Sequence, residues 1–229
     1  MKAMVLAAGI GKRLLPFTKD MPKPLIEVGT ETLLDRNINK ILDVGITEII
    51  INVSYLGDMI EKHLAKNYVD HDITVIKEQC ILGTGGGILN ALEHLGDAPF
   101  LLINADTYHE IPIDELPTEV EAAHLVGVPN PEHNNLGDFS IKDNKVIISE
   151  SQNELTFAGI SVINPVIFKT TQLPKAPFDI WNYVLKDLIN KNKISGHEAG
   201  RPLFGAKYCG GENEVSKVFL HLSISFLQY

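Results

Sequence analysis

The sequence has 229 residues, of which 45% are hydrophobic and 21% are charged, and its formal net charge is −9. A chain of this length and composition fits one large globular domain with a substantial core. The acidic balance argues against general binding to nucleic acid or to anionic membranes, because both need a broad basic surface. Any anion that the protein binds must therefore be held locally.

We expect a cytoplasmic protein with neither a nucleic-acid nor a membrane partner. The apolar runs are a few residues long, whereas a membrane-spanning helix needs roughly 20 apolar residues, and the first residues lack a signal-peptide pattern. The two cysteines, Cys80 and Cys209, lie far apart in the sequence. They give neither a disulfide framework nor a metal-ligand spacing, which favours a reducing compartment.

The first half of the chain alternates short β-rich runs with stretches of helical spacing. This alternation predicts an α/β fold, with a mainly parallel sheet covered by helices on both faces. Ligands bind such sheets at the carboxyl ends of the strands, so the loops there are the first candidates for a site. The expected strands are Lys2 to Ala8, Glu48 to Val53, Ile73 to Ile76 and Pro99 to Ile103, and the expected helices are Thr32 to Val44, Gly57 to Ala65 and Gly87 to Leu95.

Beyond Ile111 the rhythm changes, and we expect a mixed extension that could lie over the first half. Its expected elements are strands at Ala122 to Val128, Phe139 to Lys142, Val146 to Glu150 and Phe157 to Ile163, and a helix from about Asp179 to Asn190. The sequence has no internal repeat and no low-complexity tract, and no long linker separates the two halves.

The loop after the first expected strand reads LAAGIGKRLLPFTKDMPKPL, from Leu6 to Leu25. Its glycines suit the close approach of a phosphate, but position 14 is a leucine and Lys12 is followed by Arg13, so the loop fits neither the dinucleotide fingerprint nor the Walker loop. Residues 1 to 24 hold five cations and one acid, which leaves 15 cations and 28 acids elsewhere. Arg13 and Lys23 could neutralise charge on a phosphoryl group. The loop therefore predicts a local anion site, with a solvated basic loop as the alternative.

A second glycine-rich segment, LGTGGGI from Leu82 to Ile88, precedes an expected helix. Its amides would point from the helix N-terminus towards the same rim of the sheet as the first loop. A flexible turn is the alternative.

The third segment is Asn104-Ala105-Asp106, directly after an expected strand. A carboxylate in this place can hold Mg²⁺ against a triphosphate, because Mg²⁺ prefers oxygen ligands and often takes only one or two from the protein. An Asx turn is the alternative for an isolated aspartate.

Together, these segments resemble the sugar-1-phosphate nucleotidyltransferase family. Its opening signature, LAAGxGxR followed by PxT and PKPL, stands here at 6–13, 16–18 and 22–25. The resemblance covers roughly residues 1 to 196 and implies a Rossmann-like nucleotidyltransferase domain over 1–196. Residues 197–229 are then a divergent or frame-altered C-terminal segment and not a separate domain.

The resemblance implies that a nucleoside triphosphate condenses with a sugar 1-phosphate, with Mg²⁺ as cofactor, to give a nucleotide sugar and pyrophosphate. Arg13 and Lys23 would be catalytic and Asp106 would hold the metal, while the sugar-phosphate oxygen is itself the nucleophile. The implied nucleotide contacts are Leu6, Ala8, Gly9, Gly11, Lys12, Glu78 and Gly83, and the implied sugar-phosphate contacts are Asn104, Gly137, Asp138, Glu150 and Gly159.

Within the family, five segments most resemble the branch that uses UTP and N-acetylmuramate 1-phosphate in cell-wall sugar recycling: 82–87, 95–102, 130–133, 137–139 and 155–162. Mannose-1-phosphate guanylyltransferases and glucose-1-phosphate thymidylyl- or uridylyltransferases share the opening loops and are the alternatives. An NAD-dependent dehydrogenase is disfavoured by Leu14 and by the phosphate-gripping Arg13 and Lys23.

The C-terminal segment departs from the family pattern, in which a WxDVGT motif supplies a second metal-binding aspartate. Here no aspartate follows Asp187. Either the last residues come from a shifted reading frame, or the segment has diverged, with Glu198 or Glu212 replacing the aspartate or one ligand lost. A catalytically impaired nucleotide-binding protein is therefore the second alternative. We expect a monomer or a weak homodimer, with the apolar run at 218–227 as the candidate contact.

Overall fold

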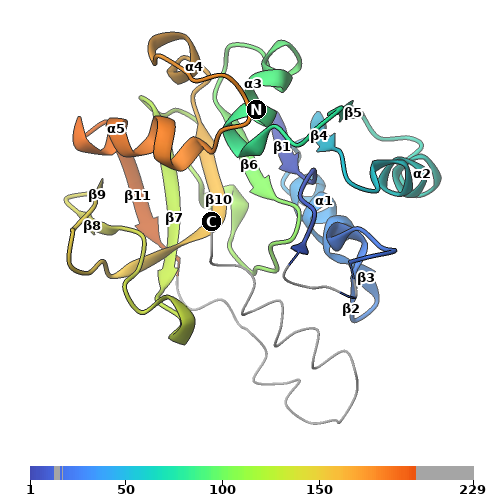
Figure 1. Cartoon of the computed structure of the whole chain (residues 1–229), viewed down its shortest axis with the longest axis horizontal. Helices are drawn as coiled ribbons and strands as arrows, with labels where there is room; N and C mark the ends of the chain where they lie inside the picture. The colour runs from blue at the N-terminus through green and yellow to red at the C-terminus, as the bar shows by residue number, and fades with distance from the viewer. Residues whose placement is uncertain (13–15, 17, 200–229) are drawn as a thin grey trace.

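The computed structural model describes residues 1–12, 16 and 18–199, and its first half is a parallel α/β unit (Figure 1). The predicted strands and helices of this half are confirmed, with ends that differ by a few residues. The strands are β1 (Ala3–Leu6), β4 (Ile49–Val53), β5 (Ile73–Lys77) and β6 (Phe100–Asn104), and the helices are α1 (Leu33–Asp43), α2 (Gly57–Asn67) and α3 (Gly83–Leu95).

The second half extends the same sheet instead of lying over the first half, which corrects the expectation. The strand order is β5-β4-β1-β6-β10-β7-β11-β9-β8 among the described residues. The added strands are β7 (Ala123–Pro129), β8 (Ser140–Lys142), β9 (Lys145–Ile147), β10 (Leu155–Ile163) and β11 (Ile194–Glu198). β10 is antiparallel to both β6 and β7, and β11 is parallel to β7. The result is a mixed sheet. Its parallel half, β5-β4-β1-β6, carries the three segments that the sequence analysis singled out, 6–25, 82–88 and 104–106.

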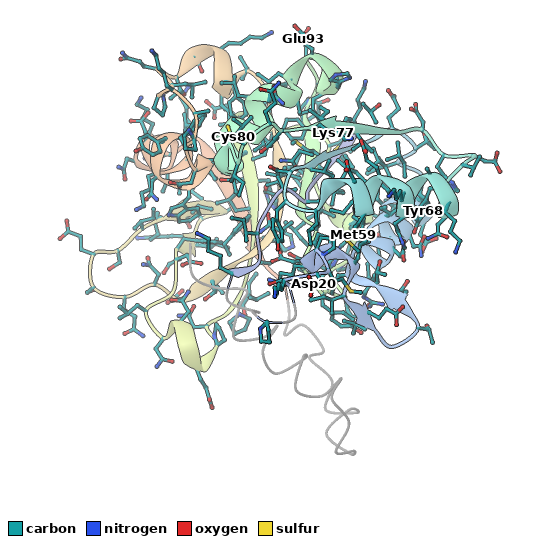
Figure 2. All side chains as sticks on the ribbon, turned by 45° about the vertical axis from the view of Figure 1, so that its right-hand side comes forward. Asp20, Met59, Tyr68, Lys77, Cys80 and Glu93 are labelled. Carbon is teal, nitrogen blue, oxygen red and sulfur yellow. The ribbon has the colours of Figure 1, made fainter. Side chains whose placement is uncertain are left out.

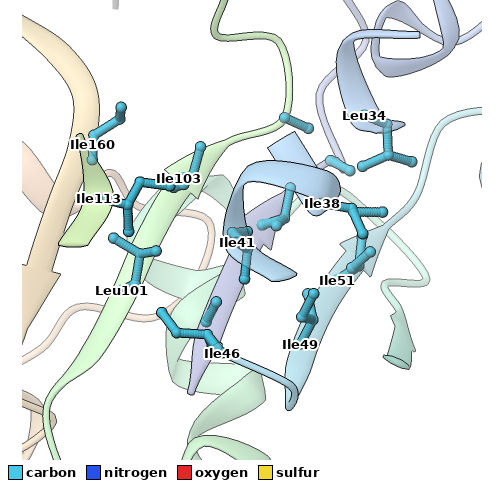
Figure 3. Close-up of a cluster of buried hydrophobic side chains, with 14 of the residues drawn as sticks. Leu34, Ile38, Ile41, Ile46, Ile49, Ile51, Leu101, Ile103, Ile113 and Ile160 are labelled. Carbon is cyan, nitrogen blue, oxygen red and sulfur yellow. The ribbon is translucent and has the colours of Figure 1, made fainter. Parts of the chain in front are cut away.

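Helices cover both faces of the sheet, as predicted. α1 and α2 pack on one face, where Leu34, Ile38 and Ile41 of α1 are fully buried against Ile49, Ile51, Leu101 and Ile103 of the strands (Figure 3). α1 begins after Thr32, whose side chain accepts a hydrogen bond from the Asp35 amide at 3.0 Å, as N-cap residues do. The other face carries α3, α4 (Ile167–Thr170), the π-helical turn η5 (Trp181–Leu185) and α5 (Lys186–Asn190).

Short elements complete the described part of the chain. They are η2 (Lys23–Leu25), β2 (Glu27–Val28), β3 (Glu31–Thr32), η3 (Ile113–Glu115) and η4 (Glu132–Asn134). Figure 2 shows Met59 on α2, Tyr68 directly after α2, Lys77 at the end of β5 and the exposed Cys80 in the segment that follows β5. Within the described ranges, no helix combines the length and the apolar character needed to cross a membrane.

Candidate active site

A cavity of about 310 Å³ opens at the carboxyl ends of the parallel strands, where the fold class predicts a ligand. It lies between the loop after β1, the end of β4, the segment after β5 and the loop after β6. Sequence-predicted residues from separate loops meet in its wall: Leu6, Ala8, Gly9, Gly11, Lys12, Lys23, Glu78, Gly83, Asn104 and Asp106.

Lys23 and Asp106 form an ion pair at one end of the cavity. Lys23 lies on η2 between two prolines and is 6% exposed, so its ammonium group is held inside the protein. Asp106 follows β6 in a backbone turn, in which the Thr107 amide donates to the Asn104 carbonyl at 3.0 Å. Charges that are shielded from water act on a ligand more strongly than exposed ones.

The loop that leads to Lys23 is tied down by its own hydrogen bonds. The Thr18 hydroxyl donates to the Gly11 carbonyl at 2.9 Å, and the Tyr55 hydroxyl donates to the Lys19 carbonyl at 2.9 Å. Gly11 has a φ of +65°, and a Cβ there would lie 3.0 Å from the Thr18 side chain and 3.2 Å from that of Lys23. Glycine is therefore needed at this position for both conformation and space.

Glu78 lies at the opposite end of the cavity and is 6% exposed. Its Oε1 accepts a hydrogen bond from Asn52 Nδ2 at 2.6 Å, and its Oε2 accepts one from the Leu82 amide at 3.1 Å. The Asn52 Oδ1 atom in turn accepts from the Ala7 amide at 3.0 Å. Sequence reasoning missed Asn52, although a lone polar residue near the end of the apolar run Ile49–Val53 was a usable signal.

The glycine-rich segment plays a different part from the one expected. α3 begins at Gly83 and not at Gly87, and the amides of Gly85 and Gly86 donate to the Phe178 carbonyl at 3.0 and 3.3 Å. These two amides therefore hold the segment before η5 and do not face a ligand, contrary to expectation. A Cβ on Gly85 would lie 2.3 Å from the Phe178 ring, which explains why the segment is glycine-rich.

Comparison with known proteins assigns the family. Residues 2–134 match the sequence profile described as nucleotidyl transferase. The chain belongs to the nucleotidyl transferase family. This nucleotidyltransferase is 34% identical over 214 residues to the N-acetylmuramate alpha-1-phosphate uridylyltransferase of Neisseria meningitidis, a match that covers 86% of this chain and 89% of the relative. It is 31% identical over 193 residues to the mannose-1-phosphate guanyltransferase of Neurospora crassa, covering 76% of this chain and 52% of that relative.

A solved structure supports the fold of the nucleotidyltransferase. A provisionally named glucose-1-phosphate thymidylyltransferase from Bacillus anthracis, in complex with sucrose, superposes with a TM-score of 0.78. The match covers 100% of this chain and 97% of the other, at 18% sequence identity. At this identity the similarity establishes the α/β nucleotidyltransferase fold and nothing about substrates.

Of the residues expected at the sugar phosphate, Asn104 lines the cavity, and the other four are not in its wall. Gly159 lies beside it, because a Cβ there would be 3.0 Å from Asn104 Nδ2. Asp138 instead accepts a hydrogen bond from the Phe157 amide at 2.8 Å, and Glu150 is exposed beyond the end of β9. Gly137 adopts a φ of +64° in the turn before β8.

Two candidate site residues named from the sequence lie outside the described residues, and a third lies near their C-terminal end. Arg13 and Glu212 lie outside the described residues. Glu198 is the last residue of β11, is exposed, and is not in the wall of the cavity.

The described part of the nucleotidyltransferase has no group of three or more His, Cys, Asp or Glu side chains placed to hold a metal. A single carboxylate is nevertheless a donor set that Mg²⁺ accepts when phosphate oxygens and water fill the other positions. Asp106 meets this requirement, since it lies in the cavity wall beside a buried cation. The residues present therefore fit a metal that is bound together with a triphosphate.

Proposed function

We propose that this chain transfers the uridylyl group of UTP to N-acetylmuramate 1-phosphate, giving UDP-N-acetylmuramic acid and pyrophosphate in cell-wall sugar recycling. One observation supports it most: a single cavity has a buried carboxylate at one end and a lysine–aspartate pair at the other. The two ends follow β5 and β6, which are three strand spacings apart in the sheet, or roughly 14 Å. A nucleotide can thus place its base at Glu78 and its phosphates at Lys23.

The base end favours a nucleobase with a ring N–H group. Each oxygen of the Glu78 carboxylate already accepts one hydrogen bond and has a second lone pair available. Uracil, thymine and guanine carry a ring N–H donor beside a carbonyl, whereas cytosine and adenine do not. This agrees with UTP and also with the alternative nucleotides.

The phosphate end supplies positive charge where the reaction develops negative charge. An oxygen of the sugar phosphate attacks the α-phosphorus, the bond to the bridging oxygen breaks, and pyrophosphate leaves. Lys23 and Lys12 stand in the cavity wall to stabilise the phosphates, and we assign the same role to Arg13. Mg²⁺, held by Asp106 and by phosphate oxygens, would neutralise further charge on the triphosphate.

The choice of sugar is supported by the Neisseria meningitidis relative, which shares more of its length with this chain than the fungal guanyltransferase does. We assign the sugar phosphate to Asn104 and to the neighbouring Gly159, with Gly137, Asp138 and Glu150 contributing from the second half. The fungal relative keeps mannose 1-phosphate with GTP as the second candidate pair.

We place the enzyme in the cytoplasm as a monomer or weak homodimer. A chain with two cysteines, one of them a free and exposed thiol at Cys80, suits a reducing compartment.

The test is pyrophosphate release from the full chain with Mg²⁺ and three substrate pairs: UTP with N-acetylmuramate 1-phosphate, GTP with mannose 1-phosphate, and dTTP with glucose 1-phosphate. The first pair should give the highest kcat/KM. A higher value for another pair would overturn the substrate assignment and leave the family intact. UTP binding without pyrophosphate release from any pair would indicate an impaired, nucleotide-binding protein.

A further inference from the structure

The loop that carries Asp106 is held from behind by one side chain of α1. Asn37 is 0% exposed, and its Nδ2 atom donates to the carbonyl oxygens of Ala105 at 3.3 Å and Thr107 at 2.9 Å. The same Nδ2 atom also donates to the Leu33 carbonyl of α1 at 2.9 Å, so its two hydrogens are shared among three acceptors. The Ala105 and Thr107 carbonyls belong to the residues on either side of Asp106. One amide group therefore links α1 to the backbone on both sides of the carboxylate.

Packing alone does not account for an asparagine at this place. Asparagine is a weak helix former, and burying its amide costs free energy unless the amide is hydrogen-bonded. The neighbouring buried positions of α1 are Leu34, Ile38 and Ile41, which fill the same interface with apolar groups (Figure 3). Among the described residues, Asn37 Oδ1 has no hydrogen-bond partner. The hydrogen bonds from Nδ2 to the loop therefore explain the asparagine better than apolar packing does.

α1 anchors the rest of the loop as well. The guanidinium group of Arg36 lies 4.2 Å from the centre of the Tyr108 ring and forms an ion pair with Glu110. Its Nη2 atom also contacts the His109 carbonyl at 3.5 Å. Asn37 holds the start of the loop and Arg36 its end, so the position of Asp106 depends on α1.

We propose that Asn37 is a positioning residue that orients Asp106 towards the metal–triphosphate complex. It is not in the wall of the cavity, so it acts through the carbonyls of Ala105 and Thr107 and does not touch a ligand. Residues behind a metal ligand that fix its orientation commonly affect metal binding strongly. The inference rests on the proposed function, because it assigns the metal to Asp106.

The test compares Asn37→Leu with Ile38→Val in the full chain. Leucine has the same number of side-chain heavy atoms as asparagine, with the same branching, and it removes both donor bonds to the loop. Ile38 lies on the same helix, is also 0% exposed, and loses one methylene without touching the loop carbonyls. Asn37→Leu should raise the Mg²⁺ concentration for half-maximal pyrophosphate release roughly 10-fold or more, with the KM for the sugar phosphate unchanged. Ile38→Val should match the wild type in both.

Two further measurements do not depend on turnover. Mn²⁺ binding to the UTP complex, followed by electron paramagnetic resonance, should weaken in Asn37→Leu and not in Ile38→Val. Hydrogen exchange of the peptide covering 105–109 in the free protein should be faster in Asn37→Leu alone. If Asn37→Leu does not fold, Asn37→Ser, which removes the reach to both carbonyls without adding apolar bulk, should give the same changes.

The outcomes separate this inference from the proposed function. Wild-type exchange at 105–109 together with wild-type Mn²⁺ binding in the Asn37 variant would overturn the positioning role. Absence of pyrophosphate release from the wild type would overturn the proposed function, and the exchange measurement would still decide whether Asn37 holds the loop.

Discussion

The carboxylate of Asp106 is paired with the buried Lys23 and is the ligand we assign to the metal. Asp106→Asn keeps the shape of the side chain and removes its charge. We expect kcat for pyrophosphate release to fall roughly 100- to 1,000-fold, the usual effect of removing one preorganised electrostatic group. A coupled pyrophosphate assay measures the loss, and circular dichroism checks that the fold persists.

The control for this change is Asp97→Asn. Asp97 is an exposed aspartate whose Oδ1 lies 2.6 Å from Lys169 Nζ on the surface. A surface ion pair of this kind contributes little to stability, so Asp97→Asn should keep wild-type activity. Full activity in Asp106→Asn would contradict the assignment of the metal to Asp106.

His109 makes the stability of the chain depend on pH. Burial, and then the positive charges of Lys40 and Arg36, lower the pKa of His109 to about 4. The unfolded chain binds a proton near pH 6.5, so the folded state loses stability as the pH falls from about 6.5 to 4. His109→Asn should remove up to about 3 kcal/mol of that loss.

Urea denaturation at several pH values tests the role of His109. Between pH 6.5 and 4, the free energy of unfolding of the wild type should fall more steeply than that of His109→Asn. The difference in slope should correspond to about one bound proton. Parallel curves for the two proteins would show that His109 does not carry this dependence.

Single residues also mark the limits of the sequence analysis. The opening motif and the strand-end rule located Lys23, Glu78 and Asp106, which the fold brings to one cavity. Asn52 and Asn37 were not predicted: Asn52 is a single polar residue in the apolar run Ile49–Val53, and Asn37 is one of several polar residues of α1. Their importance comes from partners 26 and 68 to 70 positions away, which no local pattern contains.

Among the secondary-structure elements, α3 needs glycine at its first residue, Gly83. Gly83 has a φ of +75°, and a Cβ there would lie 2.4 Å from the Phe178 carbonyl oxygen. Gly96, at the other end of α3, has a φ of +80° with nothing within 4 Å of such a Cβ. Gly96 has a ψ of −157°, a conformation that is essentially restricted to glycine, so Gly96→Ala should cost about 1 to 3 kcal/mol from the backbone alone. Gly83→Ala should cost about 1 to 3 kcal/mol more, because the Phe178 backbone must shift.

Denaturant unfolding of the two variants measures this difference. Gly83→Ala should also raise the KM for the nucleotide, since Gly83 and Thr84 line the cavity, and Gly96→Ala should leave it unchanged. Equal losses of stability in the two variants would mean that the Phe178 contact does not constrain α3.

Elements with a local pattern were predicted well, and elements defined by distant partners were not. α1 and β6 follow directly from helical spacing and from an apolar run. β11 was missed, because ISGHE has no alternation of its own and becomes a strand by pairing with β7. The glycines of α3 were interpreted as a loop, because their contact with Phe178 is invisible in the sequence.

At the scale of the whole molecule, one sheet, which has nine strands in the described part of the chain, joins the parallel first half to the mixed second half. The parallel half, β5-β4-β1-β6, carries the cavity, and β10 continues the sheet antiparallel into the second half. Repeated strand and helix patterns predicted the parallel half. The position of β10 between β6 and β7 was not predicted, because it depends on pairing between strands that are distant in the sequence.

The molecule as a whole should respond to its nucleotide through linked stability. A ligand that binds only the folded state at 100 times its Kd adds about 2.7 kcal/mol to the free energy of unfolding. For a chain of this size, that corresponds to a rise in Tm of roughly 5 to 10 °C. We expect this rise with UTP and Mg²⁺, and a smaller one with UTP and EDTA at matched ionic strength, because Asp106 then lacks the metal.

Differential scanning calorimetry measures the rise in Tm without requiring turnover. A rise in Tm without pyrophosphate release would separate binding from catalysis, as the missing C-terminal aspartate allows, whereas an unchanged Tm would contradict nucleotide binding in the cavity.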